Sequence, residues 1–197
     1  LAISKDNSDK IYDRFRNRLI VPIHDMQGRV VAFGGRSLDG QEPKYLNSPE
    51  SEIFEKGKML FAFEKASSDI RKRDKAIIVE GYFDVISLHS KGITNSVASL
   101  GTALNKYQIS QLCRCTDNKN IILNFDSDNA GILATKRVIK EVETLSLHDQ
   151  INLKILQLSH FKDPDEYLNS HTPEDYFNLI DNSSFWIDWE IDQIFKD

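Results

Sequence analysis

Six acidic side chains lie shortly after apolar runs in the second part of the sequence. They are Glu80, Asp84, Asp126, Asp128, Asp163 and Asp165. Carboxylates brought to one place repel one another, by roughly 4 kcal/mol for two charges about 4 Å apart at an effective dielectric constant near 20. A divalent cation offsets that repulsion, and Mg²⁺ is usually held by a few carboxylates together with water and substrate phosphates. These residue types therefore indicate a magnesium site for a phosphate-bearing substrate.

The spacing of these acids leaves a second interpretation open. In an extended segment, Asp126 and Asp128 project to the same side, and Ser127 points away from them. Asp128 can instead cap the helix that follows it, and Asp163 or Asp165 can cap the next one. Glu80 is harder to explain structurally, because it directly follows the buried run at residues 76–79 and precedes a glycine.

Alternating elements would bring these acids to one edge of a sheet. Strands are expected at residues 75–80, 94–101, 119–125 and 151–158, with helices at 82–92, 105–116 and 130–145. Ala134, Val138, Val142 and Leu145 share one face of the last helix. This alternation predicts an α/β fold with a parallel sheet, whose ligands bind at the carboxyl ends of the strands. Residues 174–197 are expected to be helical.

The first 75 residues have a different character. Residues 18–25 and 28–35 predict a hairpin with an edge strand at Pro22, followed by an irregular stretch at 39–51 and a helix toward residue 73. Residues 10–75 carry 14 basic and 10 acidic side chains, whereas residues 76–197 carry 10 and 18. Arg14, Arg16 and Arg18 would share one face if their segment is extended, as a phosphate-binding surface or as an ordinary solvated one.

Bulk properties indicate an ordinary globular protein. The chain has 197 residues, a net charge of −5 and 40% hydrophobic residues, with no apolar run long enough to span a membrane. Cys113 and Cys115 are spaced for neither zinc nor a redox pair, so reduced thiols in an intracellular protein are expected. Gly101 and Thr102 either approach a phosphate or form a turn, the turn being favoured. A start at Leu1 predicts an excised piece of a longer protein.

Several longer stretches resemble a known family. "IIVEGYFDV" followed by "ILNFDSDNAG" resembles the TOPRIM domain of primases, topoisomerases and some nucleases. "YDRFRNRLIVPIHDMQGRVVAFGGR", "PKYLNSPES", "VASLGTAL" and "KDPDEYL" resemble the catalytic core of bacterial replicative DNA primases of the DnaG type, over about residues 10–170. The resemblance implies part of a basic α+β subdomain at residues 1–73. It also implies a TOPRIM domain at 74–171 with a mostly parallel four-stranded sheet flanked by helices, and the start of a helical region at 172–197.

This family makes short RNA primers on single-stranded DNA from ribonucleoside triphosphates during replication. The resemblance implies two-metal nucleotidyl transfer with Mg²⁺, or Mn²⁺ as a substitute. It assigns catalysis to Glu80, Asp126 and Asp128, and metal binding to these three with Asp84, Asp163 and Asp165. It assigns nucleotide and template binding to Arg14, Arg16, Arg36, Lys44, Tyr45, Asn47 and Lys56. The division of ligands between the metals stays open, and Glu80 is alternatively a general base. Ser127 and Asn129 depart from the glycine and arginine that the family often has there.

The resemblance also implies partners and a location. Single-stranded DNA and ribonucleoside triphosphates would bind this chain, while a replicative helicase, a single-stranded-DNA-binding protein and zinc would bind regions that it lacks. A monomer in the bacterial cytoplasm, at the replication fork and away from membranes, is expected, and the piece alone need not be active. Two other functions stay open: strand cleavage by another TOPRIM enzyme, and a non-enzymatic module that binds nucleotides or Mg²⁺.

Overall fold

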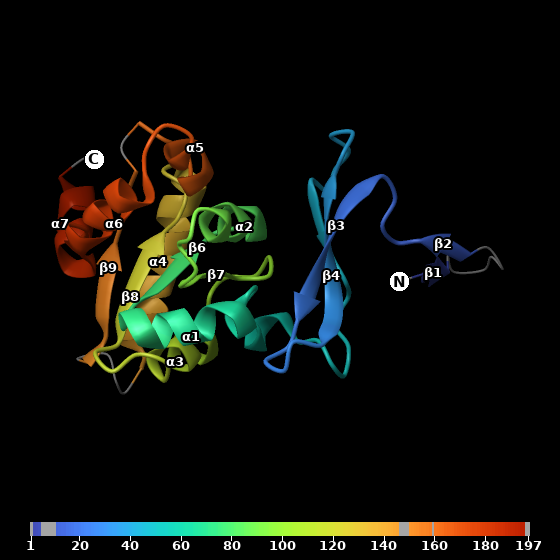
Figure 1. Ribbon diagram of the computed structural model, residues 1–197, viewed down its shortest axis with the longest axis horizontal. Helices are drawn as coiled ribbons and strands as arrows, with labels where there is room; N and C mark the ends of the chain where they lie inside the picture. The colour runs from blue at the N-terminus through green and yellow to red at the C-terminus, as the bar shows by residue number, and fades with distance from the viewer. Residues whose placement is uncertain (1, 5–10, 146–149, 159, 196–197) are drawn as a thin grey trace. The chain divides into compact units, whose positions relative to one another are not determined.

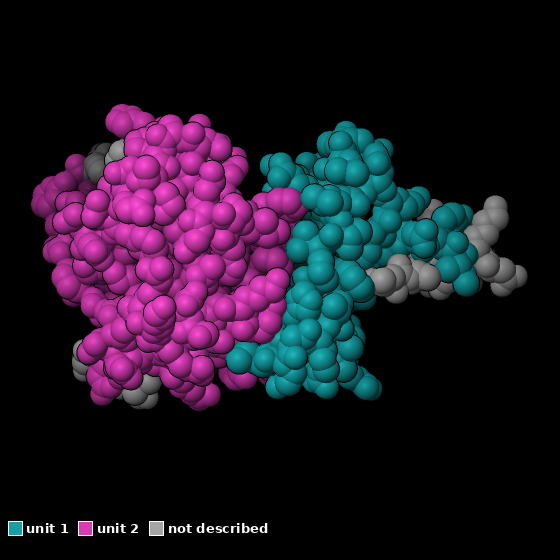
Figure 2. Space-filling model, in the orientation of Figure 1, with its two compact units in different colours: residues 1–55 teal, residues 56–197 magenta. Residues whose placement is uncertain are grey.

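The chain folds into two compact units, Leu1–Glu55 and Lys56–Asp197, coloured separately in Figure 2. The computed structural model describes residues 2–4, 11–145, 150–158 and 160–195. Residues 196–197 of the expected C-terminal helical region lie outside these. The boundary between the units falls before the helix that ends at Arg73, so that helix belongs to the same unit as the parallel sheet.

The first unit is built from antiparallel strands. Strands β1 (Ala2–Ser4) and β2 (Ile11–Asp13) pair with each other, and β3 (Arg18–His24), β4 (Val30–Ser37) and β5 (Tyr45–Asn47) form a sheet in that order. The predicted hairpin is confirmed, with the Gly28 N–H donating to the Asp25 carbonyl at 3.0 Å. Pro22 lies in the edge strand, as expected. Strand β5 was not expected, because three residues are too few to show a period.

The second unit contains the predicted α/β fold. Figure 1 shows its parallel strands β6 (Ala76–Val79), β7 (Ser96–Ala98), β8 (Asn120–Asn124) and β9 (Asn152–Ile155) surrounded by helices. The helices are η1 (Lys56–Lys58), α1 (Phe63–Arg73), α2 (Tyr82–Ser90), α3 (Lys106–Cys113), α4 (Asn129–Glu143), α5 (Pro164–Leu168), α6 (Pro173–Asp181) and α7 (Trp186–Ile194). The sheet order is β10-β9-β8-β6-β7, where β10 (Ser184–Phe185) is antiparallel to β9.

Strand β10 corrects the expectation of a continuous helical tail. Helix α6 ends at Asp181, β10 adds to the edge of the sheet, and only then does α7 begin. The break falls at Asn182 and Ser183, residue types whose side chains compete for backbone hydrogen bonds and weaken helices. The sequence does not reveal where the helix is interrupted, because aromatic residues occur on both sides of the interruption.

The core lies on both faces of the sheet. All four residues of β6 are fully buried, as expected for a central parallel strand covered by helices. Val138 and Val142 of α4 are buried in the same cluster as Leu123 of β8, which confirms the predicted apolar face. Cys113 and Cys115 are free thiols, as expected, and burial raises the pKa of Cys113 to about 11.

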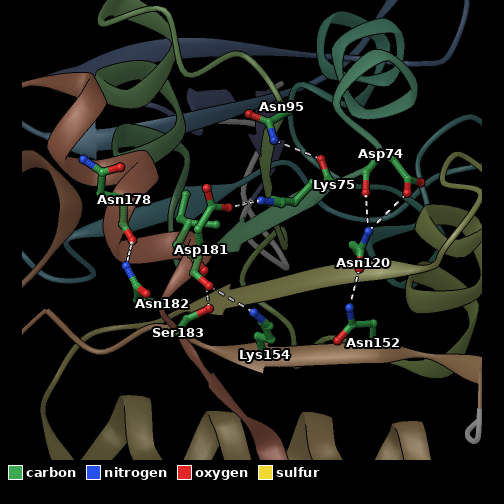
Figure 3. Close-up of polar contacts among 11 residues, drawn as sticks. Asp74, Lys75, Asn95, Asn120, Asn152, Lys154, Asn178, Asp181, Asn182 and Ser183 are labelled. Atoms are coloured by element: carbon green, nitrogen blue, oxygen red, sulfur yellow. Dashed lines mark hydrogen bonds and ion pairs between the residues drawn. The ribbon is translucent and has the colours of Figure 1, made fainter.

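The amino ends of the strands are joined by side-chain hydrogen bonds (Figure 3). The Asn120 amide donates to the carbonyl oxygen of Asp74 at 2.8 Å, and the Asn152 amide donates to Asn120 Oδ1 at 2.5 Å. Asp74 also accepts hydrogen bonds from the backbone of Asp117 and Asn118. These contacts align the starts of β6, β8 and β9, and therefore help to set where the opposite, carboxyl ends lie.

Two further expectations concern single features. Gly101 has a φ of +75° between β7 and α3, which agrees with the turn interpretation of that position. Among the described residues, no helix combines the length and apolar character needed to cross a membrane.

Candidate active site

Glu80 and Asp126 meet at the carboxyl end of the sheet. Strands β6 and β8 are parallel neighbours with Val79 opposite Asn124, so the residues after them leave the sheet at the same edge. The backbone N–H of Asp126 donates to Glu80 Oε1 at 3.1 Å. The structure thus brings together two of the three residues expected to be catalytic.

Asp128 is the N-cap residue directly before helix α4. Its Oδ1 accepts a hydrogen bond from the Gly131 N–H at 2.9 Å, so the helix-cap interpretation of Asp128 is confirmed. Gly131 itself lies against the site. A Cβ atom there would be 2.0 Å from the Asp126 carbonyl oxygen and 2.9 Å from Glu80 Oε1. Only a glycine allows the helix to approach the Glu80–Asp126 contact this closely.

The other three acids come from helices α2 and α5. Asp84 Oδ2 accepts a hydrogen bond from the Gly81 N–H at 3.0 Å in the first turn of α2. Asp163 caps α5 by accepting from the Glu166 N–H at 2.9 Å, which confirms the cap interpretation for this residue. Asp165 lies inside α5 and accepts a hydrogen bond from the Ser87 hydroxyl at 2.6 Å, which joins α5 to α2.

The carboxylates act on one another electrostatically. Burial raises the pKa of Glu80 to about 7, the charge of Asp126 adds to it, and Asp128 and Asp84 add smaller contributions. Burial likewise raises the pKa of Asp84 to about 6, with further contributions from Asp126, Asp163 and Asp165. All six predicted acids therefore contribute to one region of negative potential.

This donor set fits a hard divalent cation by type and by charge. Oxygen ligands and excess negative charge are what such an ion requires. The pKa values of Glu80 and Asp84 are raised first by burial and then by neighbouring carboxylates, and a bound cation would favour the charged forms again. Within the described residues, however, no three Asp, Glu, His or Cys side chains converge closely enough to hold an ion as they stand. Side chains would have to turn toward a bound metal.

Ser127 joins two of the loops that carry the acids. Its hydroxyl lies 3.3 Å from the carbonyl oxygens of both Leu158 and Phe161, and its N–H donates to the Lys162 carbonyl at 3.4 Å. This residue therefore links the loop after β8 to the loop before α5. Asn129 is the first residue of α4.

Sequence reasoning missed two residues next to the site. The Tyr176 hydroxyl of α6 donates to Asn124 Oδ1 at 2.7 Å, and the Asn124 amide donates to the Leu156 carbonyl at 3.2 Å. Both side chains are almost completely buried. The only signal in the sequence is an asparagine at the end of an apolar strand, which gives no hint of its partner.

Arg14, Arg16 and Arg18 of the first unit do not lie in one extended segment. Residues 14, 15 and 17 form bends, and Asn17 has a φ of +50°, so the segment is not extended and the condition for Arg14, Arg16 and Arg18 to share one face is not met. The Arg14 guanidinium donates twice to the Asn47 carbonyl, at 3.1 and 2.9 Å. Arg14 therefore helps to hold β5, while Arg16 is exposed.

Two basic side chains lie next to the ring of Tyr45. The Arg36 guanidinium and the Lys44 ammonium lie 5.9 Å and 5.5 Å from the centre of the Tyr45 ring, which is partly exposed. The seventh predicted binding residue, Lys56, begins η1 in the second unit, where its carbonyl accepts a hydrogen bond from Gln108. The predicted binding residues therefore divide between the two units.

Comparisons with known proteins agree with this architecture. The family described as DNA primase catalytic core, N-terminal domain, matches residues 1–67, and the Toprim-like family matches residues 77–168. DNA primase of Synechococcus elongatus is 54% identical over the whole chain, which spans 28% of that relative. A DNA primase domain from Pseudomonas aeruginosa has a TM-score of 0.90 and 37% identity, over 98% of this chain and 60% of that one.

A solved structure of a DnaG primase catalytic domain bound to ssDNA is also similar. Its TM-score is 0.82 at 35% identity, over 93% of this chain and 58% of that one. The chain therefore belongs to the DnaG-type DNA primases, of whose catalytic core it contains the N-terminal domain and the Toprim domain.

Proposed function

We propose that the protein containing this chain synthesises short RNA primers on single-stranded DNA during replication, by nucleotidyl transfer from ribonucleoside triphosphates. One observation carries the proposal. Within a Toprim-like domain, Glu80 and Asp126 meet at the edge where parallel sheets bind ligands, surrounded by four more carboxylates. This concentration of negative charge matches what phosphoryl-transfer sites use to hold divalent ions.

Magnesium, with manganese as a substitute, is the proposed cofactor. Toprim domains bind divalent metal ions, and Glu80, Asp126 and Asp128 with Asp84, Asp163 and Asp165 would hold them here. The bound ions would supply positive charge that neutralises the triphosphate. Glu80 has a second capability, because a carboxyl with a pKa of about 7 can exchange a proton near neutral pH. It can therefore serve as a ligand or as the acceptor of the 3′-hydroxyl proton.

The basic residues of the first unit are the proposed template and nucleotide contacts. Arg16 is exposed, and Arg36 and Lys44 flank the partly exposed ring of Tyr45. An aromatic ring beside cations can stack on a base while the cations contact phosphates. A similar DnaG catalytic domain has been solved with ssDNA bound, which supports this role. Arg14, Asn47 and Lys56 belong to the same proposed set.

The remaining expectations are also proposals. They are a core that is monomeric, acts in the bacterial cytoplasm, and reaches a replicative helicase and a single-stranded-DNA-binding protein through other regions. The expected boundaries at residues 73/74 and 171/172 are supported by the family matches at 1–67 and 77–168.

Incorporation of ribonucleotides on single-stranded DNA tests the proposal. In the full-length protein, Glu80→Gln removes the charge but keeps the size of the side chain. We expect at least a roughly 100-fold loss of primer synthesis with an unchanged folded state. Glu174→Gln, at an exposed position in the first turn of α6, is the control and should remain active.

The same preparations separate the rival functions. Near-normal synthesis by the Glu80→Gln protein would remove Glu80 from the mechanism. Cleavage of plasmid DNA without ribonucleotide incorporation would indicate a topoisomerase or nuclease. Binding of Mn²⁺ or nucleotides without either activity would indicate a non-enzymatic module.

A further inference from the structure

Tyr176 and Asn124 form a buried polar pair at the carboxyl end of β8. Tyr176 is 0% exposed and Asn124 is 1% exposed, and the Tyr176 hydroxyl donates to Asn124 Oδ1 at 2.7 Å. If this hydrogen bond is broken, neither polar group can bond to water instead, because both side chains are buried. Because an unpaired buried polar group is costly, such a pair favours one arrangement of the residues around it.

Asn124 also bonds to the backbone of Leu156, which directly follows strand β9. Its amide donates to the carbonyl of Leu156, and the N–H of Leu156 donates to the carbonyl of Leu123 at 2.8 Å. The ends of β8 and β9 are therefore joined in both directions. The loop that leaves β8 carries Asp126, and the loop that leaves β9 leads to Asp163.

Tyr176 also lies near the acids of the other elements. Burial is the main cause of its raised pKa, and the charge of Asp84 on α2 is the second cause. Its ring is 6.1 Å, between centroids, from the ring of Tyr167 on α5, the helix that contains Asp165. One side chain of α6 thus bonds to β8, lies near a ring of α5 and senses the charge of Asp84 on α2.

We propose that Tyr176 is a positioning residue for the carboxylate site. Its hydroxyl fixes the Asn124 amide, and through that amide it fixes the spacing between the loop of Asp126 and the loop of Asp163. The inference rests on the proposed function, in which this site holds divalent ions. Helix α6 then belongs to the functional unit, although it follows the Toprim-like match, which ends at residue 168.

Tyr176→Phe in the full-length protein removes only the hydroxyl. Tyr167→Phe is the matched control, because Tyr167 is also buried in the same aromatic group but makes no hydrogen bond to Asn124 in the described part of the chain. Without metal, we expect faster hydrogen exchange at residues 124–128, 156–158 and 160–163 in the Tyr176→Phe protein alone. In Mn²⁺ titrations followed by electron paramagnetic resonance, its Kd should rise about 5-fold or more.

A double variant separates positioning from stability. Tyr176→Phe combined with Asn124→Leu replaces both polar partners by apolar groups. This should restore part of the stability lost in the single variant, although the Leu156 carbonyl also loses its donor. The Mn²⁺ Kd should stay raised while kcat at saturating Mn²⁺ changes little. A Kd that recovers together with the stability would show a purely structural role.

Other outcomes would overturn the inference or the function separately. Wild-type exchange and wild-type Mn²⁺ affinity in a folded Tyr176→Phe protein, or equal changes in the Tyr167→Phe control, would exclude the positioning role. If the wild-type protein neither binds Mn²⁺ nor incorporates ribonucleotides, the proposed function fails. The exchange experiment without metal would still decide whether Tyr176 holds the two loops together.

Discussion

Gly131 lies against Asp126 without room for a side chain. A Cβ atom on Gly131 would be 2.0 Å from the Asp126 carbonyl oxygen, and this oxygen belongs to the backbone, so it cannot turn aside as a flexible side chain would. The first turn of α4 can therefore pack this closely against the loop of Asp126 only because residue 131 has no side chain.

Gly131→Ala should destabilise the protein by about 1–3 kcal/mol, because the methyl group forces the helix and the loop apart. The sign of this change in the free energy of unfolding is informative, because alanine inside a helix is otherwise more stabilising than glycine by about 1 kcal/mol. Urea unfolding measures the change. Ala130→Gly, at an exposed position of the same helix, is the control for helix propensity. A stabilised Gly131→Ala protein would contradict the observed contact.

Ser127→Ala removes the hydroxyl that bridges to the carbonyls of Leu158 and Phe161. We expect a loss of about 0.5–1.5 kcal/mol in the free energy of unfolding, together with weaker Mn²⁺ binding, because the two acidic loops separate more easily. Ser127→Thr keeps the hydroxyl and should retain both properties. Equal losses in the alanine and threonine variants would show that the hydroxyl is not the cause.

The raised pKa of Glu80 predicts a pH dependence of stability in the absence of divalent ions. The pKa rises from 4.5 to about 7 on folding, so the folded state holds this proton more tightly than the unfolded state. The contribution of Glu80 is then fully present below about pH 4.5 and is lost as the pH rises through about 7. The loss should be on the order of 1 kcal/mol after allowance for solvent screening.

Denaturation of the wild-type and Glu80→Gln proteins with a chelator present measures this effect. The wild-type free energy of unfolding, relative to that of the variant, should fall across this pH range. Asp84, whose pKa is also raised, is present in both proteins. If the difference in free energy of unfolding between the two proteins does not change with pH, the folded state does not disfavour the ionised form of Glu80.

Arg14 and Arg16 should respond differently to replacement by alanine. Arg16→Ala should weaken binding of single-stranded DNA and reduce the slope of log affinity against log salt by about 0.7, with little change in stability, because Arg16 is exposed. Arg14→Ala should cost about 1 kcal/mol of stability, because its guanidinium holds the Asn47 carbonyl. Arg29→Ala, in the hairpin turn, is the control. An equal slope change there would indicate an effect of net charge alone.

Much of the fold could be predicted from local pattern. The apolar run of β6, the apolar face of α4 and the turn at Asp25–Gly28 each depend on residues close together in the sequence. Strand β5 and strand β10 could not be predicted in this way. Both are short, and each forms because a neighbouring strand edge offers hydrogen bonds, a condition that its own residues do not encode.

The sequence by itself determined which acids lie at strand ends and helix starts, because their places follow from the alternation of apolar and polar segments. The caps formed by Asp128 and Asp163 are local in the same way, because each reaches a backbone N–H three residues further on. Tertiary structure decided the long-range contacts: it placed Asp126 against Glu80, made Ser127 a link between loops and set Tyr176 beside Asn124. These contacts join residues up to 52 positions apart, and only the packing of the sheet and its helices brings such residues within hydrogen-bonding distance.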